Sequence, residues 1–336
     1  MCTLTAKAST SKYKVYKNEQ DASIIPTFAV TIWLGWMGGL TYSIIFAATL
    51  ANAFQRNIII AIFAISLILP PAFPGKLGET IGNWIMKQAE KYFGLKVTIE
   101  NEDAFHKLNK EGRAVIFATE PHDLLPYGVF VFNSALGYLP GKIGETVKVL
   151  MTGAIFNLPI MKHVYSWVGG RPVDKKTFRS RLANNLSLAF VPGGVQEVTL
   201  IDPRNKDDLI LYLRKRKGFI KLALEHGTPI VPVFIFNLDH SFGYVMPRGK
   251  LVNTIARKIG FLPLFFWGRF FIPFGIPNPV NISVVFGEPF DIPFEGDNIS
   301  NESVEKYHAI FLQKTIELFE RHKNAEGYGH RTLKIL

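Results

Sequence analysis

The 336-residue chain has one cysteine, Cys2. A single cysteine excludes a disulfide framework and a cysteine-rich zinc site, and its place in a polar leader argues against cysteine catalysis. The sequence also lacks a P-loop, a GxGxxG fingerprint, an HExxH metal motif and a GxSxG nucleophile elbow. We therefore expect no metal, no resident cofactor and no covalent serine intermediate.

Charged residues are also scarce, at 19% of the chain, and the basic ones dominate: 38 Lys and Arg against 27 Asp and Glu give a net charge of +11. Hydrophobic residues make up 48%, and 28 are phenylalanines. This composition excludes a disordered chain. It indicates either a membrane protein with a polar domain or a basic nucleic-acid binder. The second is disfavoured, because no nucleic-acid-binding motif is present.

The hydrophobic excess is concentrated near the N-terminus. Residues 22–55 contain no charge, and Arg56 is followed by a second uncharged run, residues 57–75. A membrane-spanning helix needs about 20 apolar residues, which the first run provides and the second barely reaches. The joint between them predicts the tip of a helical hairpin, the alternative being one long span followed by a buried core helix. That joint consists of Asn52, Gln55, Arg56 and Asn57.

Lysines flank this segment on both sides, which favours the cytosol for both flanks. They are Lys7, Lys12, Lys14 and Lys17 before it, and Lys76, Lys87, Lys91 and Lys96 after it. We therefore divide the chain into a polar cytosolic leader (1–25), a membrane hairpin (26–75) and a single α/β domain (76–336).

The α/β domain is predicted from short apolar strands that alternate with helical patterns, which is typical of a mostly parallel sheet with flanking helices. The predicted strands are Leu95–Glu100, Ala114–Thr119, Val147–Met151, Leu188–Val191, Ile230–Phe236 and Ile282–Phe286. The predicted helices are Gly82–Phe93, Leu124–Leu136, Phe178–Leu186, Gly218–His226 and Ser303–His322. Functional loops of such sheets lie at the carboxyl ends of the strands.

The first candidate motif is Glu120-Pro121-His122-Asp123, directly after an apolar strand. A histidine at the carboxyl end of a strand is well placed to act as a general base, and its ordinary pKa near 6.5 suits proton removal at neutral pH. On spacing alone, a surface-loop histidine is an equal alternative.

The second motif, residues 191–197, reads Val-Pro-Gly-Gly-Val-Gln-Glu and also follows a short strand. The main chain of Gly193 and Gly194 could approach a ligand closely and offer N–H groups to an oxyanion. Glu197 could orient a protonated histidine. The alternative is an ordinary Gly-Gly turn with a capping glutamate.

A third motif is a run of four cations, Arg214 to Lys217, that leads into a helical pattern. A solvated helix start is the ordinary explanation of such a run. Cations are unfavourable at a helix N-terminus, however, so the run also indicates an anionic ligand such as the phosphates of coenzyme A.

One more segment stands out: Phe261–Phe274 reads FLPLFFWGRFFIPF, with Arg269 as its only charge. Its Pro and Gly breaks disfavour a regular strand or helix. Two interpretations remain open: a core segment, or a loop at the membrane interface or in the wall of a lipid-tail pocket, since aromatic residues and Arg suit the headgroup boundary.

In this order, the segments resemble the diacylglycerol acyltransferase type 2 family, which includes monoacylglycerol and wax-ester acyltransferases. The resemblance covers nearly the whole chain, through the hairpin, EPH, PGGVQE, RKGFIKLALEHGTPIVPVF, the PFG segment and VVFGEPFDIP. The usual His-Pro-His-Gly appears here with Glu120 first, as in the plant and algal branch, and with Asp123 in place of a small residue. The His-x4-Asp signature of the wider glycerolipid acyltransferases is absent, because Tyr127 stands at the Asp position.

The resemblance implies a glycerolipid-acyltransferase-like fold and transfer of an acyl group from acyl-CoA to diacylglycerol, without an acyl-enzyme. It assigns the catalytic base to His122, with Glu197 preferred over Glu120 and Asp123 as its acidic partner. The implied partners are acyl-CoA, diacylglycerol and membrane lipid, not nucleic acid, with self-assembly left open. Candidates for the coenzyme A phosphates are Arg216, Lys217, Lys221 and, more weakly, Lys175.

The implied location is the endoplasmic reticulum membrane, extending to lipid droplets, with the catalytic domain in the cytosol. Two alternatives remain: another acceptor, either monoacylglycerol or a fatty alcohol, and a non-catalytic lipid-binding hairpin protein.

Overall fold

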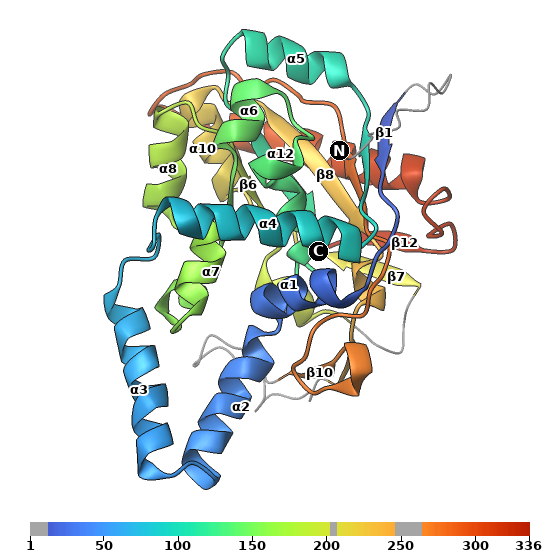
Figure 1. Ribbon diagram of the computed structural model, residues 1–336. Coiled ribbons are helices and arrows are strands. Elements are labelled where there is room, and N and C mark those ends of the chain that lie inside the picture. Colours follow the sequence, from blue (N-terminus) through green and yellow to red (C-terminus); the bar gives the residue numbers. More distant parts are fainter. Residues whose placement is uncertain (1–12, 202–206, 246–263) are drawn as a thin grey trace.

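An eight-stranded sheet forms the centre of the protein (Figure 1) in the computed structural model, which describes residues 13–201, 207–245 and 264–336. The strand order is β1-β2-β11-β8-β3-β6-β4-β5, and five of its seven pairings are parallel. The strands are β1 (Lys14–Lys17), β2 (Lys96–Ile99), β3 (Ile116–Glu120), β4 (Lys148–Met151), β5 (Gly170–Pro172), β6 (Leu188–Phe190), β8 (Ile230–Phe236) and β11 (Ser283–Phe286).

Helices cover both faces of this sheet, because alternate residues of each strand point to opposite faces. In β3, Phe117 packs in one core cluster while Ile116 and Ala118 pack in the other. The first face is covered by α1 (Ile24–Leu34), α4 (Lys76–Tyr92), α5 (Glu102–Lys110), α6 (Gly141–Thr146) and α7 (Met161–Trp167). The second is covered by α8 (Lys175–Ala183), α10 (Gly218–His226) and α12 (Asn301–His322).

The six predicted strands are confirmed, as β2, β3, β4, β6, β8 and β11. Four predicted helices correspond to α4, α8, α10 and α12. The helix predicted over Leu124–Leu136 is wrong: the segment forms two 3₁₀ turns, η1 (Tyr127–Phe132) and η2 (Ser134–Leu136). Pro126 directly precedes η1, and every residue of η1 is buried. A run of apolar residues that is buried on all sides has the same composition as a buried helix, which explains the wrong prediction.

The polar leader contributes more than a tail. Its strand β1 pairs antiparallel with β2, aligning Lys14 with Ile99 and Lys17 with Lys96. Two small sheets lie outside the main one. An antiparallel pair joins β9 (Gly243–Val245) to β10 (Phe265–Trp267), and a parallel pair joins β7 (Asp208–Leu211) to β12 (Thr332–Ile335).

The uncharged N-terminal region divides into two parts. Helix α1 packs on the α/β domain, with Ala29, Val30 and Trp33 buried. Helices α2 (Trp36–Thr49) and α3 (Ala53–Ile68) then form a hairpin that projects from the domain (Figure 1). Its turn is fixed by a capping box between Asn52 and Gln55.

A helical hairpin is therefore present, but it is shorter than residues 26–75, and its insertion into a membrane stays a prediction. The alternative of a buried core helix is wrong for α3, in which only Ser66 is buried. Among the described residues, no single helix is long and apolar enough to cross a membrane. Helices α1 and α2 pass that test only together, and they are bent by 70° at their junction.

The hairpin is attached to the domain at both of its ends. At the end of α3, Lys162 Nζ donates to Leu67 O (2.6 Å), and the His163 ring lies 2.9 Å from Ser66 O. Cations suit the carboxyl end of a helix, whose last carbonyls lack partners. Near the start of α2, Gly38 N–H donates to Phe274 O (2.9 Å). These contacts fix the direction in which the hairpin projects.

The described part of the Phe261–Phe274 segment is partly core and partly exposed loop, and its place at a membrane interface stays a prediction. Residues 261–263 lie outside the described residues. Phe266, in the short strand β10, is buried in the core. Phe270 and Phe271, in the turn η5 (Arg269–Phe271), are exposed.

Candidate functional site

The candidate site lies where β3, β6 and β8 end, which we call the carboxyl edge. His122 follows β3, and Glu197 lies in α9 (Val195–Val198), which follows β6. The two strands are parallel neighbours, with Ala118 aligned to Phe190. Their carboxyl ends therefore meet at one edge of the sheet and bring the EPHD and Gly-Gly turns together.

Glu197 binds the main chain around the site, not the imidazole. Its Oε2 accepts the N–H of His122 (2.9 Å), and its Oε1 accepts the N–H of Tyr212 (2.8 Å). The side chain is almost fully buried. Because main-chain N–H groups occupy both oxygens, Glu197 positions the turn that carries His122. It does not orient the ring, which was the role that the sequence had suggested.

The His122 ring is oriented by a main-chain carbonyl. Its Nδ1 lies 2.9 Å from Asp123 O, and because a carbonyl only accepts, Nδ1 carries the hydrogen. Nε2 then bears the lone pair, and no described residue binds it. Burial lowers the pKa of His122, against the opposing effect of the Asp123 carbonyl. The ring is therefore a neutral base at neutral pH.

Glu120 and Glu197 form a buried carboxyl pair. Glu120 is fully buried, and its Oε1 accepts the N–H of Gly193 (3.1 Å). Burial, followed by the charge of Glu197, raises the pKa of Glu120 well above its usual range. Burial also raises the pKa of Glu197 to about 7, although N–H groups of His122 and Tyr212 oppose this. Two such carboxyls hold one proton between them.

The Gly-Gly turn is shaped around this pair. A Cβ on Gly193 would lie 1.8 Å from Glu197 Oε1, so no side chain fits there. Gly194 has φ 61°, in the left-handed region that favours glycine. The N–H of Gly193 is already bound to Glu120. Of the two predicted oxyanion donors, Gly194 is thus the one whose N–H no described residue occupies.

The four cations predicted to bind the coenzyme A phosphates have different surroundings. Arg216 belongs to the site: its Nη2 donates to Gly193 O (3.1 Å), and its guanidinium lies over the Tyr212 ring at 5.2 Å. Lys217 is paired with Glu305 at 2.5 Å. Lys221 is exposed on α10. Lys175 is exposed directly after β5, at the same carboxyl edge but three strands from β3.

Sequence reasoning missed a second acidic group at this edge. Asp239 follows β8 and is bound by the Tyr328 hydroxyl and the Arg331 guanidinium. Burial, followed by the charge of Asp239, raises the pKa of Asp123 to about 7. Asp239 could have been found, because it follows a predicted strand. Tyr328 and Arg331 lie far along the chain with no local signal.

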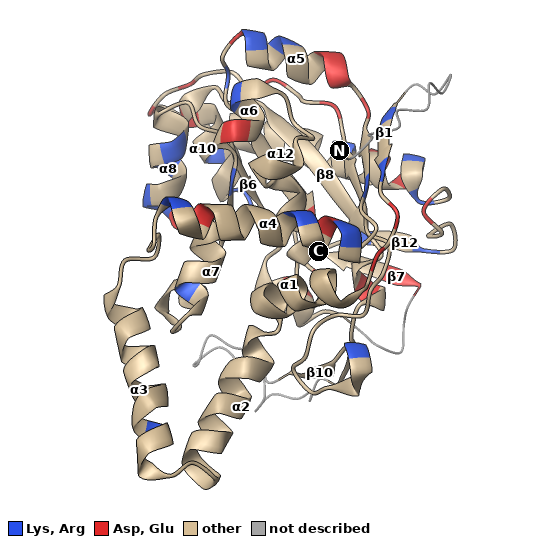
Figure 2. Cartoon of the chain, in the orientation of Figure 1, with Lys and Arg blue, Asp and Glu red and all other residues tan. Residues whose placement is uncertain are grey.

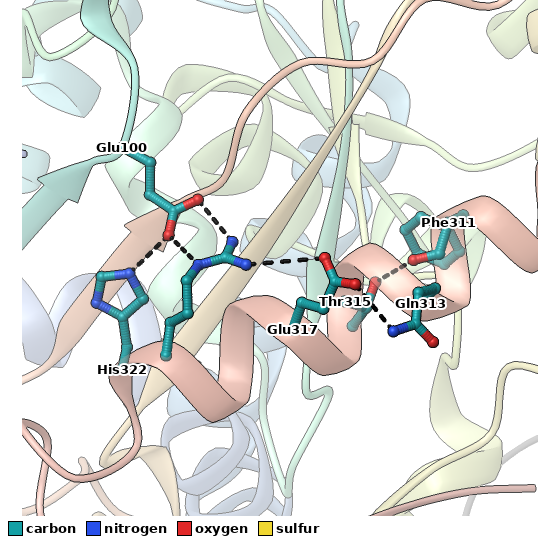
Figure 3. Close-up of polar contacts among 7 residues, drawn as sticks. Glu100, Phe311, Gln313, Thr315, Glu317 and His322 are labelled. Carbon is teal, nitrogen blue, oxygen red and sulfur yellow. Dashed lines mark hydrogen bonds and ion pairs between the residues drawn. The ribbon is translucent and has the colours of Figure 1, made fainter.

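A contrasting cluster lies at the opposite edge, where β2 ends (Figure 3). Glu100 accepts Nε and Nη2 of Arg321 and faces Nε2 of His322, each at 2.8 Å. Burial favours a higher pKa for Glu100, but the hydrogen bonds from His322 and Arg321 outweigh it, so its pKa is lowered. We call these three residues the Glu100 cluster. In the described part of the chain, no group of three or more His, Cys, Asp or Glu side chains could hold a metal ion.

Comparison with known proteins places these features in context. A family model described as diacylglycerol acyltransferase matches residues 52–335. Diacylglycerol O-acyltransferase 2 of Dictyostelium discoideum is 35% identical over 222 residues, which are 62% of this chain and 66% of that protein. Diacylglycerol O-acyltransferase 1 of Eremothecium gossypii is 30% identical over 67% of this chain and 50% of that protein. The human diacylglycerol O-acyltransferase 2 is 26% identical over 76% of this chain and 68% of that protein.

The chain thus spans less than two thirds of the first two relatives. Among solved structures, the 1-acyl-sn-glycerophosphate acyltransferase PlsC of Thermotoga maritima aligns with 88% of this chain and 93% of that one. Its TM-score of 0.43 and 14% identity are too low to support an argument.

Proposed function

The chain belongs to the diacylglycerol acyltransferase family, and we propose that it transfers a fatty acyl group from acyl-CoA to the free hydroxyl of diacylglycerol. The products are triacylglycerol and coenzyme A. The observation that carries the proposal is the His122 ring: Asp123 O holds Nδ1 at 2.9 Å, which leaves Nε2 as a base at the carboxyl edge.

In the proposed reaction, Nε2 of His122 takes the hydroxyl proton while the acceptor oxygen attacks the thioester carbonyl directly. The carbon–sulfur bond then breaks, and the coenzyme A thiolate takes the proton back from His122. No acyl-enzyme forms. The lowered pKa of His122 supports this role, because the ring is neutral before the reaction begins.

The developing negative charge on the thioester oxygen needs a donor. The Gly194 N–H is our candidate, since Gly193 N–H is engaged by Glu120. One such donor typically contributes about 3 kcal/mol to the stability of the transition state. The Glu120–Glu197 pair holds the two turns in place, since Glu120 accepts the N–H of Gly193 and Glu197 accepts the N–H of His122.

Arg216 is the first candidate for the coenzyme A phosphates. It lies against the Gly-Gly turn and keeps donors beyond the one bound to Gly193 O. Lys221 and Lys175 are exposed cations that could extend the contact, while Lys217 would first have to leave Glu305.

We further propose that the α2–α3 hairpin enters the endoplasmic reticulum membrane or the surface of a lipid droplet, with the catalytic domain in the cytosol. The exposed side chains of the hairpin support this, since Ile45, Leu50, Phe54, Ile60 and Ile68 are each more than half exposed. A neutral lipid acceptor dissolves only in that environment.

The test is an assay of the full chain in lipid nanodiscs, with labelled acyl-CoA and equal amounts of diacylglycerol, monoacylglycerol and fatty alcohol. We expect labelled triacylglycerol, formed about 10²–10⁴-fold more slowly by the His122→Ala variant. Wax ester as the main labelled product would mean that the acceptor is the fatty alcohol, and diacylglycerol would mean that it is monoacylglycerol. No labelled product from any acceptor would favour a non-catalytic lipid-binding protein.

A matched pair of variants tests the donor site. Arg216→Gln should raise KM for acyl-CoA by about 10-fold, the loss of one charge-assisted contact to a phosphate. Lys217→Gln, whose cation is held by Glu305, should change KM little. A KM for acyl-CoA that stays unchanged in Arg216→Gln would exclude Arg216 from the donor site.

A further inference from the structure

Residues Arg269–Phe274, which we call the aromatic turn, expose large apolar side chains. Phe270 is 66% exposed, Phe271 82% and Ile272 44%. Three neighbouring apolar side chains open to water are unfavourable in a water-facing loop, and such a patch marks a contact with another apolar surface.

The aromatic turn is held in this conformation. Phe270, Phe271 and Phe274 have φ values of 61°, 56° and 53°, in the left-handed region that bulky side chains rarely adopt. Phe271 N–H donates to Gly268 O (3.1 Å), and Phe274 N–H donates to Phe266 O (2.9 Å). The phenylalanines are therefore presented outward by a defined backbone.

The aromatic turn is continuous with the hairpin. Phe274 O accepts the N–H of Gly38 (2.9 Å), and Pro273 O accepts the hydroxyl of Tyr42 (2.6 Å). Both partners lie in α2. Figure 1 shows β10 on the side of the domain from which α2 and the rest of the hairpin project.

The start of α1 extends the same apolar surface. Arg269 Nη1 donates to Ala22 O (3.0 Å) and to Thr27 Oγ1 (2.7 Å). The exposed residues of the first turns of α1 are again large and apolar, with Ile24 86% and Phe28 59% exposed.

Charge is almost absent from this surface. Arg56 and Arg269 are the only charged residues within the described ranges 24–75 and 264–287. In Figure 2 the hairpin and the region around β10 are nearly all tan, whereas charged residues are spread over the upper part of the molecule. Arg269 lies over the Phe270 ring at 4.8 Å, the pairing that suits the headgroup boundary of a bilayer.

We infer that the aromatic turn is a second membrane contact, which inserts Phe270 and Phe271 beneath the headgroups of the bilayer that the hairpin enters, with Arg269 at headgroup level. The inference rests on the membrane placement in the proposed function. Two contacts prevent the domain from rotating about the hairpin. They also hold the carboxyl edge near the lipid, because Asp239 and Ser241 lead directly into β9, which pairs with β10.

The single natural cysteine makes a direct test practical. In a Cys2→Ser background, one cysteine is introduced at Phe271, in α2 at Ile45, or at Phe294, and is labelled with an environment-sensitive fluorophore. Phe294 is the matched control, because it is a phenylalanine with 74% exposure beside Gly227, which ends α10 on the second face of the sheet, whereas the hairpin follows α1 on the first face. Each labelled full chain is reconstituted into phosphatidylcholine vesicles with nitroxide lipids, and iodide is added as the aqueous quencher.

We expect the probes at Phe271 and Ile45 to lose most of their emission to nitroxide lipids and little to iodide, and the probe at Phe294 to do the reverse. The Phe271 probe should respond more to nitroxides near the headgroups than to deep ones, as for a segment about 5–10 Å below the boundary. A quenched Ile45 probe with an iodide-accessible Phe271 probe would overturn the inference and leave the hairpin proposal intact.

Two further outcomes also overturn the inference. If the Ile45 probe is not quenched by lipid, the membrane placement in the proposed function fails, and the second contact fails with it. If the Phe271 probe is protected from both quenchers, another copy of the chain covers the turn. Cysteine cross-linking at Phe271 between copies would then identify that contact.

Discussion

Two clusters in this molecule combine glutamate and histidine at the end of a strand, and their electrostatics differ. In the Glu100 cluster, one buried carboxylate receives three hydrogen bonds from Arg321 and His322, and its pKa is lowered. At the carboxyl edge, the two buried carboxyls of Glu120 and Glu197 face each other and mainly main-chain N–H groups, and both pKa values are raised.

The difference separates a structural role from a chemical one. In the Glu100 cluster, Arg321 and His322 of α12 bind the carboxylate that follows β2, and these contacts fasten the helix to the sheet. At the carboxyl edge, His122 keeps Nε2 free of described partners and stays neutral, which is costly to arrange and useful for proton transfer. Residue composition alone does not distinguish the two clusters, whereas their hydrogen-bond partners do.

The largest difference in kcat should come from replacing the histidine of each cluster by alanine. His122→Ala should lower kcat by about 10²–10⁴-fold, the usual contribution of a general base, with KM for acyl-CoA little changed. His322→Ala should keep kcat and lower only the free energy of unfolding. Steady-state kinetics in nanodiscs measure both. Equal losses of kcat would mean that the two histidines do not differ in function.

The next largest effect on kcat should come from a side chain added at the Gly-Gly turn. Gly193→Ala places a Cβ 1.8 Å from Glu197 Oε1, which must displace the carboxylate that holds His122. We expect kcat to fall by about 10²-fold, as for a misplacement of about 1 Å. Gly218→Ala is the matched control: nothing lies within 4 Å of its Cβ and it begins α10. Near-normal kcat in Gly193→Ala, with the chain folded, would contradict the positioning role of Glu197.

The shared proton predicts a smaller effect that depends on pH. The pKa of Glu197 is raised from 4.5 to about 7, and that of Glu120 is also raised. The free energy of unfolding therefore has its full contribution from the bound proton below pH 4.5 and loses it as pH rises through about 7. Glu120→Gln supplies the hydrogen permanently and still offers an oxygen to Gly193 N–H. It should keep kcat within a few-fold of wild type and flatten the alkaline decline.

Glu120→Ala is the counterpart, since it leaves Gly193 N–H without its acceptor. The expected loss in unfolding free energy is about 1–3 kcal/mol. Kinetics from pH 6 to 9, with urea unfolding at each pH, separate the two variants. A Glu120→Gln enzyme with an unchanged alkaline decline would show that the pair does not share a proton.

Much of this fold follows from local pattern. The strand Ile230–Phe236 consists of β-branched and aromatic residues apart from Pro232, so its type is encoded within the run itself. The buried segment Leu124–Leu136 shows the limit of that reasoning, because burial on all sides erases the periodicity that separates an α-helix from 3₁₀ turns. Gly35 is a local signal for the break between α1 and α2, but the 70° angle of the bend and the packing of α1 against α4 are not encoded locally.

For the candidate site, the sequence predicted that the EPHD and Gly-Gly turns meet, but it did not predict their contacts or Asp239. The rule that parallel strands share a carboxyl edge was enough to bring His122 and Glu197 together. Which atom of His122 meets Glu197 depends on main-chain direction in two turns, and the structure gives the N–H instead of the ring. The roles of Tyr212 and Arg331 depend on segments brought in from elsewhere in the chain.

The smallest effect belongs to the Glu100 cluster, and it should appear in stability alone. Because the pKa of Glu100 is lowered, its contribution to stability is present above its ordinary value of 4.5 and is lost as pH falls through its lower value in the folded protein. Glu100→Gln should therefore lower the free energy of unfolding by about 1–3 kcal/mol at pH 7, with a smaller difference from wild type in acid. Urea unfolding at the two pH values measures this.

Glu317→Gln is the control on the same helix, because Glu317 is 49% exposed and its pair with Arg321, at 3.8 Å, is an exposed one. Such a pair contributes at most about 0.5 kcal/mol to stability. In both variants kcat should equal that of wild type, since the cluster lies at the edge of the sheet opposite His122. A fall in kcat for Glu100→Gln without a fall in stability would connect the two edges and remove the distinction between a structural and a chemical carboxylate in this fold.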